Sequence, residues 1–300
     1  MINTELIQLS ADVEGAIASN RPIVALESTV IAHGLPRPQN LETAHRLETI
    51  VRNTGAVPAT IAILQGKLRV GLNENELRRI SETEAIKKIS TRDLPIAMAR
   101  AWDGATTVAS TIWIAHRAGV QVLATGGIGG VHRGTLPDVS ADLPELARTP
   151  MVVVCSGAKI VLDLPATREW LETHGITVVG YQCDELPAFY SRKSGLSVDG
   201  TVNSAKEVAE FVTAHRSLGM KSALLVVVPV PAAAEVPSEM LNRVLDEAVN
   251  EAEKSRVGGR ELTPFLLSRM AQQSGGATLK ANIALLENNA QVAAEVASAL

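Results

Sequence analysis

Short apolar runs alternate with amphipathic stretches along most of the 300-residue chain. The apolar runs are bounded by glycine, proline or charged residues, as is typical of buried strands. The stretches between them carry apolar residues at helical spacing, which indicates helices packed on the faces of a parallel sheet. The pattern therefore predicts an α/β protein with three α/β/α layers and a mostly parallel, mixed central sheet.

The same pattern places the individual elements. Strands are expected at 22–26, 87–90, 122–124, 151–155, 176–182 and 223–228, and the range 56–71 is expected to hold two strands joined by a turn at Gly66. Helices are expected at 38–53, 74–85, 107–119, 166–174 and 205–218, and three more within 237–300, with breaks near Gly258 and Gly275. The polar range 190–203 is expected to be a surface loop. Because no repeat or change of composition marks a boundary, residues 1–300 are expected to form a single domain.

Composition narrows the class of protein. Hydrophobic residues make up 46% of the chain but aromatic residues only 3%, which predicts a core of Val, Ile, Leu and Ala. A net charge of −4 argues against a nucleic-acid polymer as partner, without excluding one small phosphate. Cys155 and Cys183 lie in or beside apolar runs and are expected to be buried free thiols.

The chain ends and the longest apolar run bear on location. The first residues lack the basic and apolar regions of a signal peptide. The run from Ala223 to Val236 is broken by prolines and is too short to span a bilayer. We therefore expect a cytoplasmic protein with no membrane partner.

The stretch from Val122 to Asp163 carries the densest candidate chemistry. The run VLA leads into the loop TGGIGGVHRG, and the run MVVVC leads into SGAK. If both strands are parallel, both loops lie at the same edge of the sheet, where such sheets bind ligands. Four side chains are therefore expected to converge on one pocket: Asp138, Ser140, Asp142 and Lys159.

The glycine-rich loop does not have the spacing of a dinucleotide fingerprint. A GxGxxG motif opens a helix, whereas this loop continues through His132 and Arg133 to Pro137. A nicotinamide or flavin cofactor is therefore not expected. Glycines that serve only tight turns are the simpler alternative, but it leaves the neighbouring His, Arg and Asp unexplained.

A second candidate feature is the loop of small residues in DGATTVAS, which precedes the helix expected from Thr107. Small side chains let main-chain N–H groups approach a ligand, and the amino terminus of a helix favours anions. This predicts a phosphate site around Thr106 to Val108. Lys88 stands near the carboxyl end of another expected strand.

Several single residues have both a catalytic and a structural interpretation. A lone lysine is usually solvated, but the small and apolar neighbours of Lys159 favour the neutral amine that forms a Schiff base. Glu27, at a strand end, either caps the following segment or donates a proton with its pKa raised by burial. Asp138 and Asp142 could share one face of a turn and bind a hydrated divalent cation, although Asp142 equally suits capping of the next helix.

Ten motifs then carry a resemblance to a known family. They are ALESTVIAHGLPRPQN, GAVPATIAI, KISTRDLP, GATTVAST, ATGGIGGVHRG, DVSADL, VCSGAK, GYQCDELPAFY, TPFLL and LKANI. In this order, and over nearly the whole chain, they resemble the pseudouridine-5′-phosphate glycosidases. This family, also called pseudouridylate synthases, includes indigoidine-synthase-A-like proteins.

The resemblance implies reversible cleavage of the C–C glycosidic bond of pseudouridine 5′-phosphate to uracil and ribose 5-phosphate. It also implies a homotrimer and a divalent cation, usually Mn2+, with Asp138 at the metal site. Glu27 is implied as the proton donor and Lys159 as the nucleophile, and Asp142 as a group that moves protons between sugar and base. Substrate contacts are implied for Lys88, Thr107 and Val108 at the phosphate, for the triplet Ser140, Ala141 and Asp142, and for Asn282 at the uracil.

Two other functions share part of these residues. A Schiff-base aldolase or lyase acting on a different sugar phosphate would use the same lysine, acid and phosphate loop. A non-enzymatic sensor of sugar phosphates or nucleotides would keep Lys88 and the Thr-rich loop but would have no use for both Glu27 and Lys159. A sugar or nucleoside kinase is a weaker rival because the sequence has no recognisable ATP loop.

Overall fold

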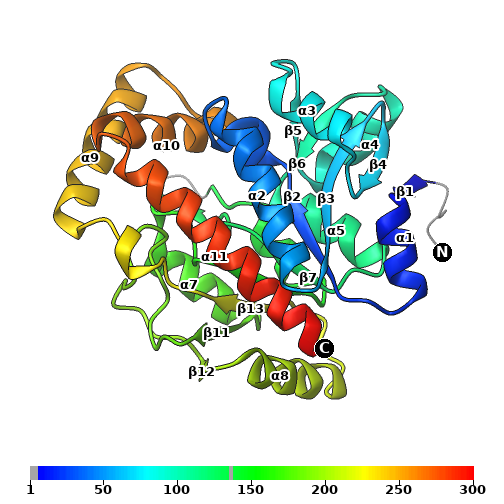
Figure 1. Ribbon diagram of the computed structural model, residues 1–300. Coiled ribbons are helices and arrows are strands. Elements are labelled where there is room, and N and C mark those ends of the chain that lie inside the picture. Colours follow the sequence, from blue (N-terminus) through cyan, green and yellow to red (C-terminus); the bar gives the residue numbers. More distant parts are fainter. Residues whose placement is uncertain (1–5, 135–137) are drawn as a thin grey trace.

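The structure is a computed structural model that describes residues 6–134 and 138–300. Within these residues, eleven strands form one large sheet between two layers of helices (Figure 1). The helices α2 (Gln39–Asn53) and α11 (Ala277–Ala299) cross in front of the sheet in Figure 1, and α5 (Val108–Arg117) and α7 (Leu164–Thr173) lie behind it. The predicted three-layer α/β/α architecture is confirmed.

The sheet is mixed but mostly parallel, as predicted. Its order is β1 (Ile7–Leu9), β4 (Lys67–Val70), β3 (Val57–Leu64), β2 (Ile23–Glu27), β7 (Val122–Ala124), β9 (Val152–Cys155), β13 (Leu224–Val227), β11 (Thr177–Tyr181) and β12 (Gly200–Val202). From β3 to β12 every neighbouring pair is parallel, whereas β4 runs antiparallel to β3. Two further strands, β5 (Lys87–Ile89) and β6 (Gly104–Thr106), join through β6, which is antiparallel to β3.

The tight turn between β3 and β4 shows how local sequence sets this topology. Gln65 and Gly66 both have positive φ, at 50° and 72°. Such a pair forms the two-residue hairpin turn that matches strand twist. A Cβ at Gly66 would lie 2.7 Å from the carbonyl oxygen of Met98, so glycine is required there for space as well as for conformation.

The remaining helices include the predicted ones together with α1 and α4, which the sequence pattern did not predict. They are α1 (Ala11–Ala18), α3 (Glu74–Glu82), α4 (Leu94–Ala99), α6 (Asp142–Leu146), α8 (Ala205–Ser217), α9 (Ser238–Lys254) and α10 (Leu262–Gln273). Short helical turns are η2 (Val30–Gly34), η3 (Thr91–Asp93), η4 (Ala232–Ala234) and η5 (Gly259–Glu261). The three C-terminal helices and the breaks near Gly258 and Gly275 are confirmed. The π-helical turn η2 lies between the strand expected at 22–26 and the helix expected at 38–53, where the sequence pattern predicts no element.

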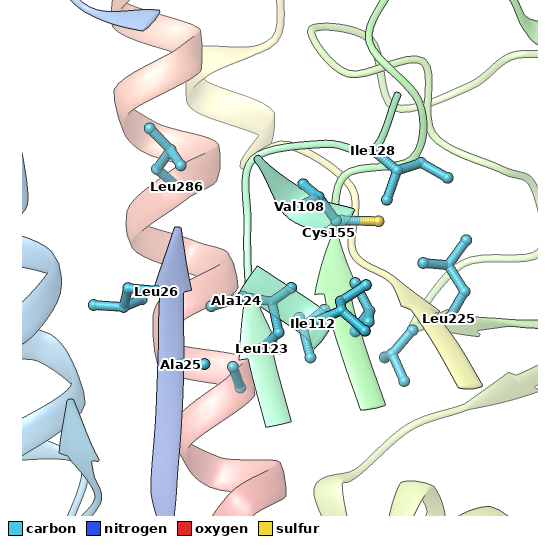
Figure 2. Packing of buried hydrophobic residues seen from close by; sticks show 14 of the residues in the cluster. Ala25, Leu26, Val108, Ile112, Leu123, Ala124, Ile128, Cys155, Leu225 and Leu286 are labelled. Atoms are coloured by element: carbon cyan, nitrogen blue, oxygen red, sulfur yellow. The ribbon is translucent and has the colours of Figure 1, made fainter. Parts of the chain in front are cut away.

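The hydrophobic core holds in place the strands whose carboxyl ends carry the candidate site residues. Figure 2 shows Leu26 on β2 and Leu123 on β7 packed among side chains that include Ile112 of α5 and Leu286 of α11. Leu123 and Ile112 are fully buried. Burial of one such side chain contributes about 1.5–3 kcal/mol, so the centre of the sheet is firmly held from both faces. The predicted core of aliphatic residues is confirmed.

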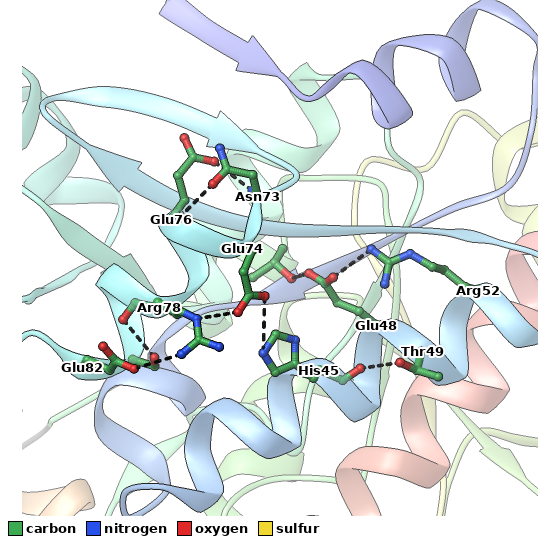
Figure 3. Close-up of polar contacts among 11 residues, drawn as sticks. His45, Glu48, Thr49, Arg52, Asn73, Glu74, Glu76, Arg78 and Glu82 are labelled. Carbon is green, nitrogen blue, oxygen red and sulfur yellow. Dashed lines mark hydrogen bonds and ion pairs between the residues drawn. The ribbon is translucent and has the colours of Figure 1, made fainter.

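Polar contacts organise the start of α3 and the buried face of α2 (Figure 3). The Asn73 side chain accepts from the Glu76 N–H at 3.0 Å, and the Glu76 carboxylate accepts from the Asn73 N–H at 2.9 Å, which forms a capping box. Glu48 of α2 accepts from the Thr60 hydroxyl of β3 at 2.7 Å and pairs with Arg52 at 2.9 Å. The buried bond between Glu48 and Thr60 attaches α2 to the sheet.

Two expectations about connecting segments are wrong. The range 190–203 is not all surface loop, because the Tyr190 side chain is 1% exposed and Gly200–Val202 forms the edge strand β12. The residues Gly104–Thr106 form β6 rather than a loop. Both strands are three residues long, which is too short for a hydrophobic period to reveal them, and their pairing is decided by tertiary contacts.

Two further expectations concerned the cysteines and membrane-spanning segments. Cys155 is a buried free thiol, and burial raises its pKa to about 12. Cys183 is also free but only half-buried, which corrects the expectation that both are buried. Among the helices of residues 6–134 and 138–300, none has the length and apolar character needed to cross a membrane.

Candidate active site

A cavity of about 280 Å³ lies where β2, β5, β7 and β9 reach their carboxyl ends. It is lined by all ten residues that the sequence analysis selected, namely Glu27, Lys88, Thr107, Val108, Asp138, Ser140, Ala141, Asp142, Lys159 and Asn282. The prediction that the residues after β7 and β9 converge on one pocket is confirmed. Parallel strands bring these loops to one edge of the sheet, as expected for a ligand site.

Glu27 is the last residue of β2 and is 6% exposed. Its Oε1 accepts a hydrogen bond of 2.5 Å from the hydroxyl of Thr125, which follows β7. Burial raises the pKa of the carboxyl group, and the nearby positive charge of Lys159 opposes this rise. A buried carboxyl with a raised pKa is suited to donate a proton near neutral pH.

Lys159 is held beside the glycine loop by main-chain bonds. Its N–H donates to the carbonyl of Ile128 at 3.2 Å, and the Ile128 N–H donates to the carbonyl of Gly157 at 3.0 Å. The two loops therefore continue the parallel pairing of β7 and β9 beyond the strand ends. A small antiparallel sheet of β8 (Val131–His132) and β10 (Leu162–Asp163), which the sequence pattern did not predict, joins the same two loops further on.

Two glycines of this loop, Gly129 and Gly130, provide space rather than turns. A Cβ at Gly129 would lie 2.2 Å from Ser140 Oγ and 2.8 Å from Asp142 Oδ2, and a Cβ at Gly130 would lie 2.4 Å from Thr167 Oγ1. Neither glycine has a positive φ. The alternative of glycines for tight turns only is therefore wrong at these positions. The loop continues into β8, which confirms that it does not open a helix.

Asp142 is fixed by two main-chain donors. Its Oδ1 accepts from the Ala109 N–H of α5 at 2.9 Å, and its Oδ2 accepts from the Gly129 N–H at 2.8 Å. Asp142 is the first residue of α6, whose cap position is Ala141, with no side-chain capping bond. The alternative that Asp142 caps its own helix is therefore wrong, because its carboxylate instead binds the first turn of α5 and the glycine loop.

The proposed phosphate region lies at the start of α5. Thr107 is the cap residue of this helix, Val108 is its first residue, and half-buried Lys88 lines the same cavity from β5. Burial lowers the pKa of the Lys88 amine, and the positive charge of Lys159 lowers it further. Thr106 does not belong to this region, because its buried hydroxyl donates to a main-chain carbonyl of β3 at 2.7 Å. The expected anion loop is therefore shorter than the sequence suggested.

Asp138 lines the cavity as an exposed residue. Its carbonyl accepts from the His132 N–H at 2.8 Å, and the next residue, Val139, pairs with Val131 in an antiparallel bridge. The chain is thus extended at Asp138, and the expectation that it shares a turn with Asp142 is wrong. Among the described residues no group of three His, Cys, Asp or Glu side chains could enclose a metal ion. A single exposed carboxylate fits only a cation that keeps most of its waters.

Other cavity residues were missed from the sequence. They are Thr29, His33, His132, Phe189 and Thr263. Burial lowers the pKa of the His33 imidazole, which favours its neutral form. Phe189 has a φ of 62°, which is strained for an aromatic residue, and its ring lies against the glycine loop. All five stand inside the motifs that carry the family resemblance, but no periodicity gave them a role in the site. Thr29, His33, Phe189 and Thr263 reach the cavity only because η2, α10 and the segment before Tyr190 pack beside it.

This fold and cavity define an α/β enzyme site in which a buried acid and a lysine face a single pocket. The Indigoidine synthase A like protein family matches residues 12–299. The chain belongs to this family, and the resemblance noted in its motifs is confirmed.

Relatives and solved structures agree with this assignment. The pseudouridine-5′-phosphate glycosidase of Geobacillus kaustophilus is 49% identical over 298 residues, covering 99% of each chain. That of Caldanaerobacter subterraneus is 49% identical and covers 97% of this chain and 95% of the relative. An indigoidine synthase A-like protein of Thermotoga maritima superposes with a TM-score of 0.89 at 39% identity, covering 97% of this chain and 95% of the other. A prealnumycin C-glycosynthase in complex with ribulose 5-phosphate gives 0.90 at 40% identity, covering 99% and 97%.

Proposed function

We propose that this protein catalyses reversible cleavage of the C–C glycosidic bond of pseudouridine 5′-phosphate. One water is consumed, and uracil and ribose 5-phosphate are formed. The observation that carries the proposal is the buried Glu27 beside Lys159, in a cavity that is also lined by Lys88 of β5 and by the start of α5. The names of the glycosidase relatives and the sugar phosphate bound to the C-glycosynthase support the same chemistry.

A carbon leaving group demands an electron path that an ordinary nucleosidase does not need. In an N-glycoside, nitrogen departs with the bonding electrons while the ring oxygen donates to the anomeric carbon. In pseudouridine the base is attached through carbon, which leaves far less readily. Opening the sugar ring and attaching an amine to C1′ supply a new electron source for breaking the C–C bond.

The cavity residues can be assigned to the successive steps. Glu27 protonates the ribose ring oxygen as the bond from this oxygen to C1′ breaks, and Lys159 attacks C1′ to give a covalent adduct. Asp142 then moves a proton to the base carbon as the C–C bond breaks, so that uracil leaves and the nitrogen of Lys159 forms an imine with C1′. Water hydrolyses the imine, which releases ribose 5-phosphate and the free amine.

The geometry supports these roles. Burial raises the pKa of Glu27 and so favours its protonated form, and the charge of Lys159 acts on it more strongly than any other named charge. Asp142 has both carboxylate oxygens held by main-chain N–H groups, so its position relative to the sugar is fixed. Prepositioned groups of this kind lower the entropic cost of each proton transfer.

The phosphate is expected to be essential for efficient turnover. Lys88 and Val108 line the cavity, and Val108 is the first residue of α5, whose amino terminus favours anions. Unphosphorylated pseudouridine should therefore have a kcat/KM lower by at least about a hundredfold, because a charge-assisted contact contributes about 1.5–3 kcal/mol and several are lost. Steady-state kinetics with both compounds provide the measurement. Equal kcat/KM values would rule out this phosphate site.

The divalent cation is expected at Asp138, bound through waters. A cation there would supply positive charge at the cavity wall, and the single exposed carboxylate predicts weak, chelatable binding. EDTA should abolish activity and Mn2+ should restore it, and Asp138→Asn should require a higher Mn2+ concentration for half-maximal activation. Titration of Mn2+ binding by electron paramagnetic resonance checks the site independently of turnover. Unchanged Mn2+ affinity in Asp138→Asn would place the cation elsewhere.

Three further attributes belong to the proposal. Classification as a carbon–oxygen lyase and a homotrimeric assembly follow from the family resemblance, and a cytoplasmic location follows from the sequence pattern. Light scattering of the purified protein distinguishes a trimer from the 31.7 kDa monomer. These attributes remain predictions.

One assay separates the proposed function from its rivals. Purified protein is incubated with pseudouridine 5′-phosphate and Mn2+, and the products are separated by liquid chromatography. The proposal predicts uracil and ribose 5-phosphate in equal amounts. An aldolase acting on another sugar phosphate would release no uracil, and a sensor would bind ligand without consuming it.

A further inference from the structure

A buried chain of hydrogen bonds joins the C-terminal helix to the proposed acid. Asn289 of α11 is fully buried. Its side-chain amide donates to the carbonyl of Thr125 at 2.9 Å and to the hydroxyl of Ser156 at 3.1 Å. The hydroxyl of Thr125, a residue only 2% exposed, donates in turn to Oε1 of Glu27.

Burial of the Asn289 side chain would cost free energy if these hydrogen bonds were not made. The buried face of α11 is mostly Ala, Leu and Val, and a buried amide without partners costs several kcal/mol. The bonds reach the two strand ends that lead to the catalytic loops. Thr125 follows β7 and begins the glycine loop, and Ser156 follows β9 and lies three residues before Lys159.

The direction of the bond from Thr125 distinguishes the two oxygens of Glu27. Oε1 accepts from the Thr125 hydroxyl, so a proton on the carboxyl group resides on Oε2 while this bond is made. Oε2 is then the atom that can deliver a proton to the sugar. Without Thr125 the carboxyl group could rotate and exchange its two oxygens.

We propose that Thr125 is a positioning residue that holds Oε1 of Glu27 so that the proton is delivered from Oε2, and that Asn289 fixes both Thr125 and the Lys159 loop. This inference rests on the proposed function, because it assigns a task to groups around the same acid. It adds two residues that do not line the cavity and therefore do not touch the substrate.

A distinct consequence concerns protonation. The groups that face Glu27 are Lys159, Thr125, Asp142 and Lys88. The Thr125 hydroxyl donates to the carboxylate and so favours its charged form, which lowers the pKa that burial raises. Thr125→Val should therefore raise the pKa of Glu27 further. Since the protonated acid is the active form, the loss of activity at high pH should move to higher pH in this variant.

The first experiment compares Thr125→Val with Thr125→Ser, which keeps the hydroxyl donor. In Thr125→Val the plateau kcat should fall by about tenfold to a hundredfold, which is part of the rate enhancement that a general acid provides. The KM should stay within about twofold of the wild-type value. Thr125→Ser should recover the wild-type pH profile. With free ribose 5-phosphate and borohydride, both variants should form the trapped adduct at the wild-type rate, because an open-chain sugar needs no acid to open its ring.

A measurement without turnover keeps the inference testable if no uracil is released. The carbonyl stretch of protonated Glu27 is followed by difference infrared spectroscopy across pH and assigned by its loss in Glu27→Gln. The inference predicts an upward shift of this titration in Thr125→Val. An unshifted titration, or a kcat within twofold of wild type in an active enzyme, would overturn the role of Thr125.

The second experiment tests Asn289. Asn289→Ala should slow both turnover and adduct formation with ribose 5-phosphate by about tenfold or more, because it releases the strand ends on both sides. Ser156→Ala removes only the hydrogen bonds between Ser156 and Asn289 and leaves those of Thr125 in place. This smaller change is expected to slow adduct formation more than it shifts the pH profile. If both variants formed the adduct at the wild-type rate, Asn289 would have only a structural role. Failure of wild type to release uracil would instead reject the proposed function.

Discussion

Lys159→Ala is expected to lower the turnover of pseudouridine 5′-phosphate by several orders of magnitude while the protein stays folded. The lysine supplies the covalent bond through which carbon departs, and loss of a nucleophile of this kind is not compensated by neighbouring groups. The side chain lines the cavity and is only half-buried, so its removal leaves the core intact. The check is kcat/KM together with a thermal melt.

A matched control uses a lysine outside the cavity. Lys254, exposed near the end of α9, does not line the pocket, and Lys254→Ala should keep wild-type kinetics. Residual activity above about a hundredth of wild type in Lys159→Ala would show that lysine is not the covalent catalyst.

Glu27→Gln is expected to separate ring opening from covalent capture. Glutamine keeps the shape of the side chain and can still accept from Thr125, but it cannot donate an acidic proton. With pseudouridine 5′-phosphate this variant should form no borohydride-trapped adduct, and its turnover should fall by about a hundredfold to ten-thousandfold. With free ribose 5-phosphate it should still form the adduct, because that sugar presents its aldehyde without help.

The control for this experiment tests wild type and both variants with each of the two ligands. Wild type should form both adducts, Lys159→Ala neither, and Glu27→Gln only the one from ribose 5-phosphate, each measured by intact mass. If Glu27→Gln accumulated the pseudouridine-derived adduct as fast as wild type, Glu27 would act later, for example in protonating the departing base.

The architecture and the cavity could be predicted because the signals behind them are local. Buried parallel strands give continuous apolar runs, and their carboxyl ends necessarily face one edge of the sheet. This rule alone places Glu27, at the end of β2, and Lys159, after β9, at that edge. The long motifs added the family.

The predictions that were wrong concern contacts between segments that are distant in the sequence. The carboxylate of Asp142 binds α5 rather than its own helix, and the glycine at 129 is required by Ser140 rather than by a turn. No local pattern in the sequence indicates that Asp142 binds α5 or that Gly129 lies against Ser140. Asn289 did carry a weak signal, since an amide on a helix rich in Ala, Leu and Val indicates a buried polar network. Its partners Thr125 and Ser156 could not be read from sequence.

The cavity contains two lysines, and this makes the choice of nucleophile the central point to test. Burial lowers the pKa of Lys88, so its amine is also chemically competent to attack a carbonyl carbon. The account assigns Lys88 to the phosphate and Lys159 to the covalent step. The adduct formed from pseudouridine 5′-phosphate is therefore trapped with borohydride and located by peptide mass spectrometry. The account predicts the reduced sugar phosphate on Lys159 alone, and an adduct on Lys88, or none on either lysine, would contradict it.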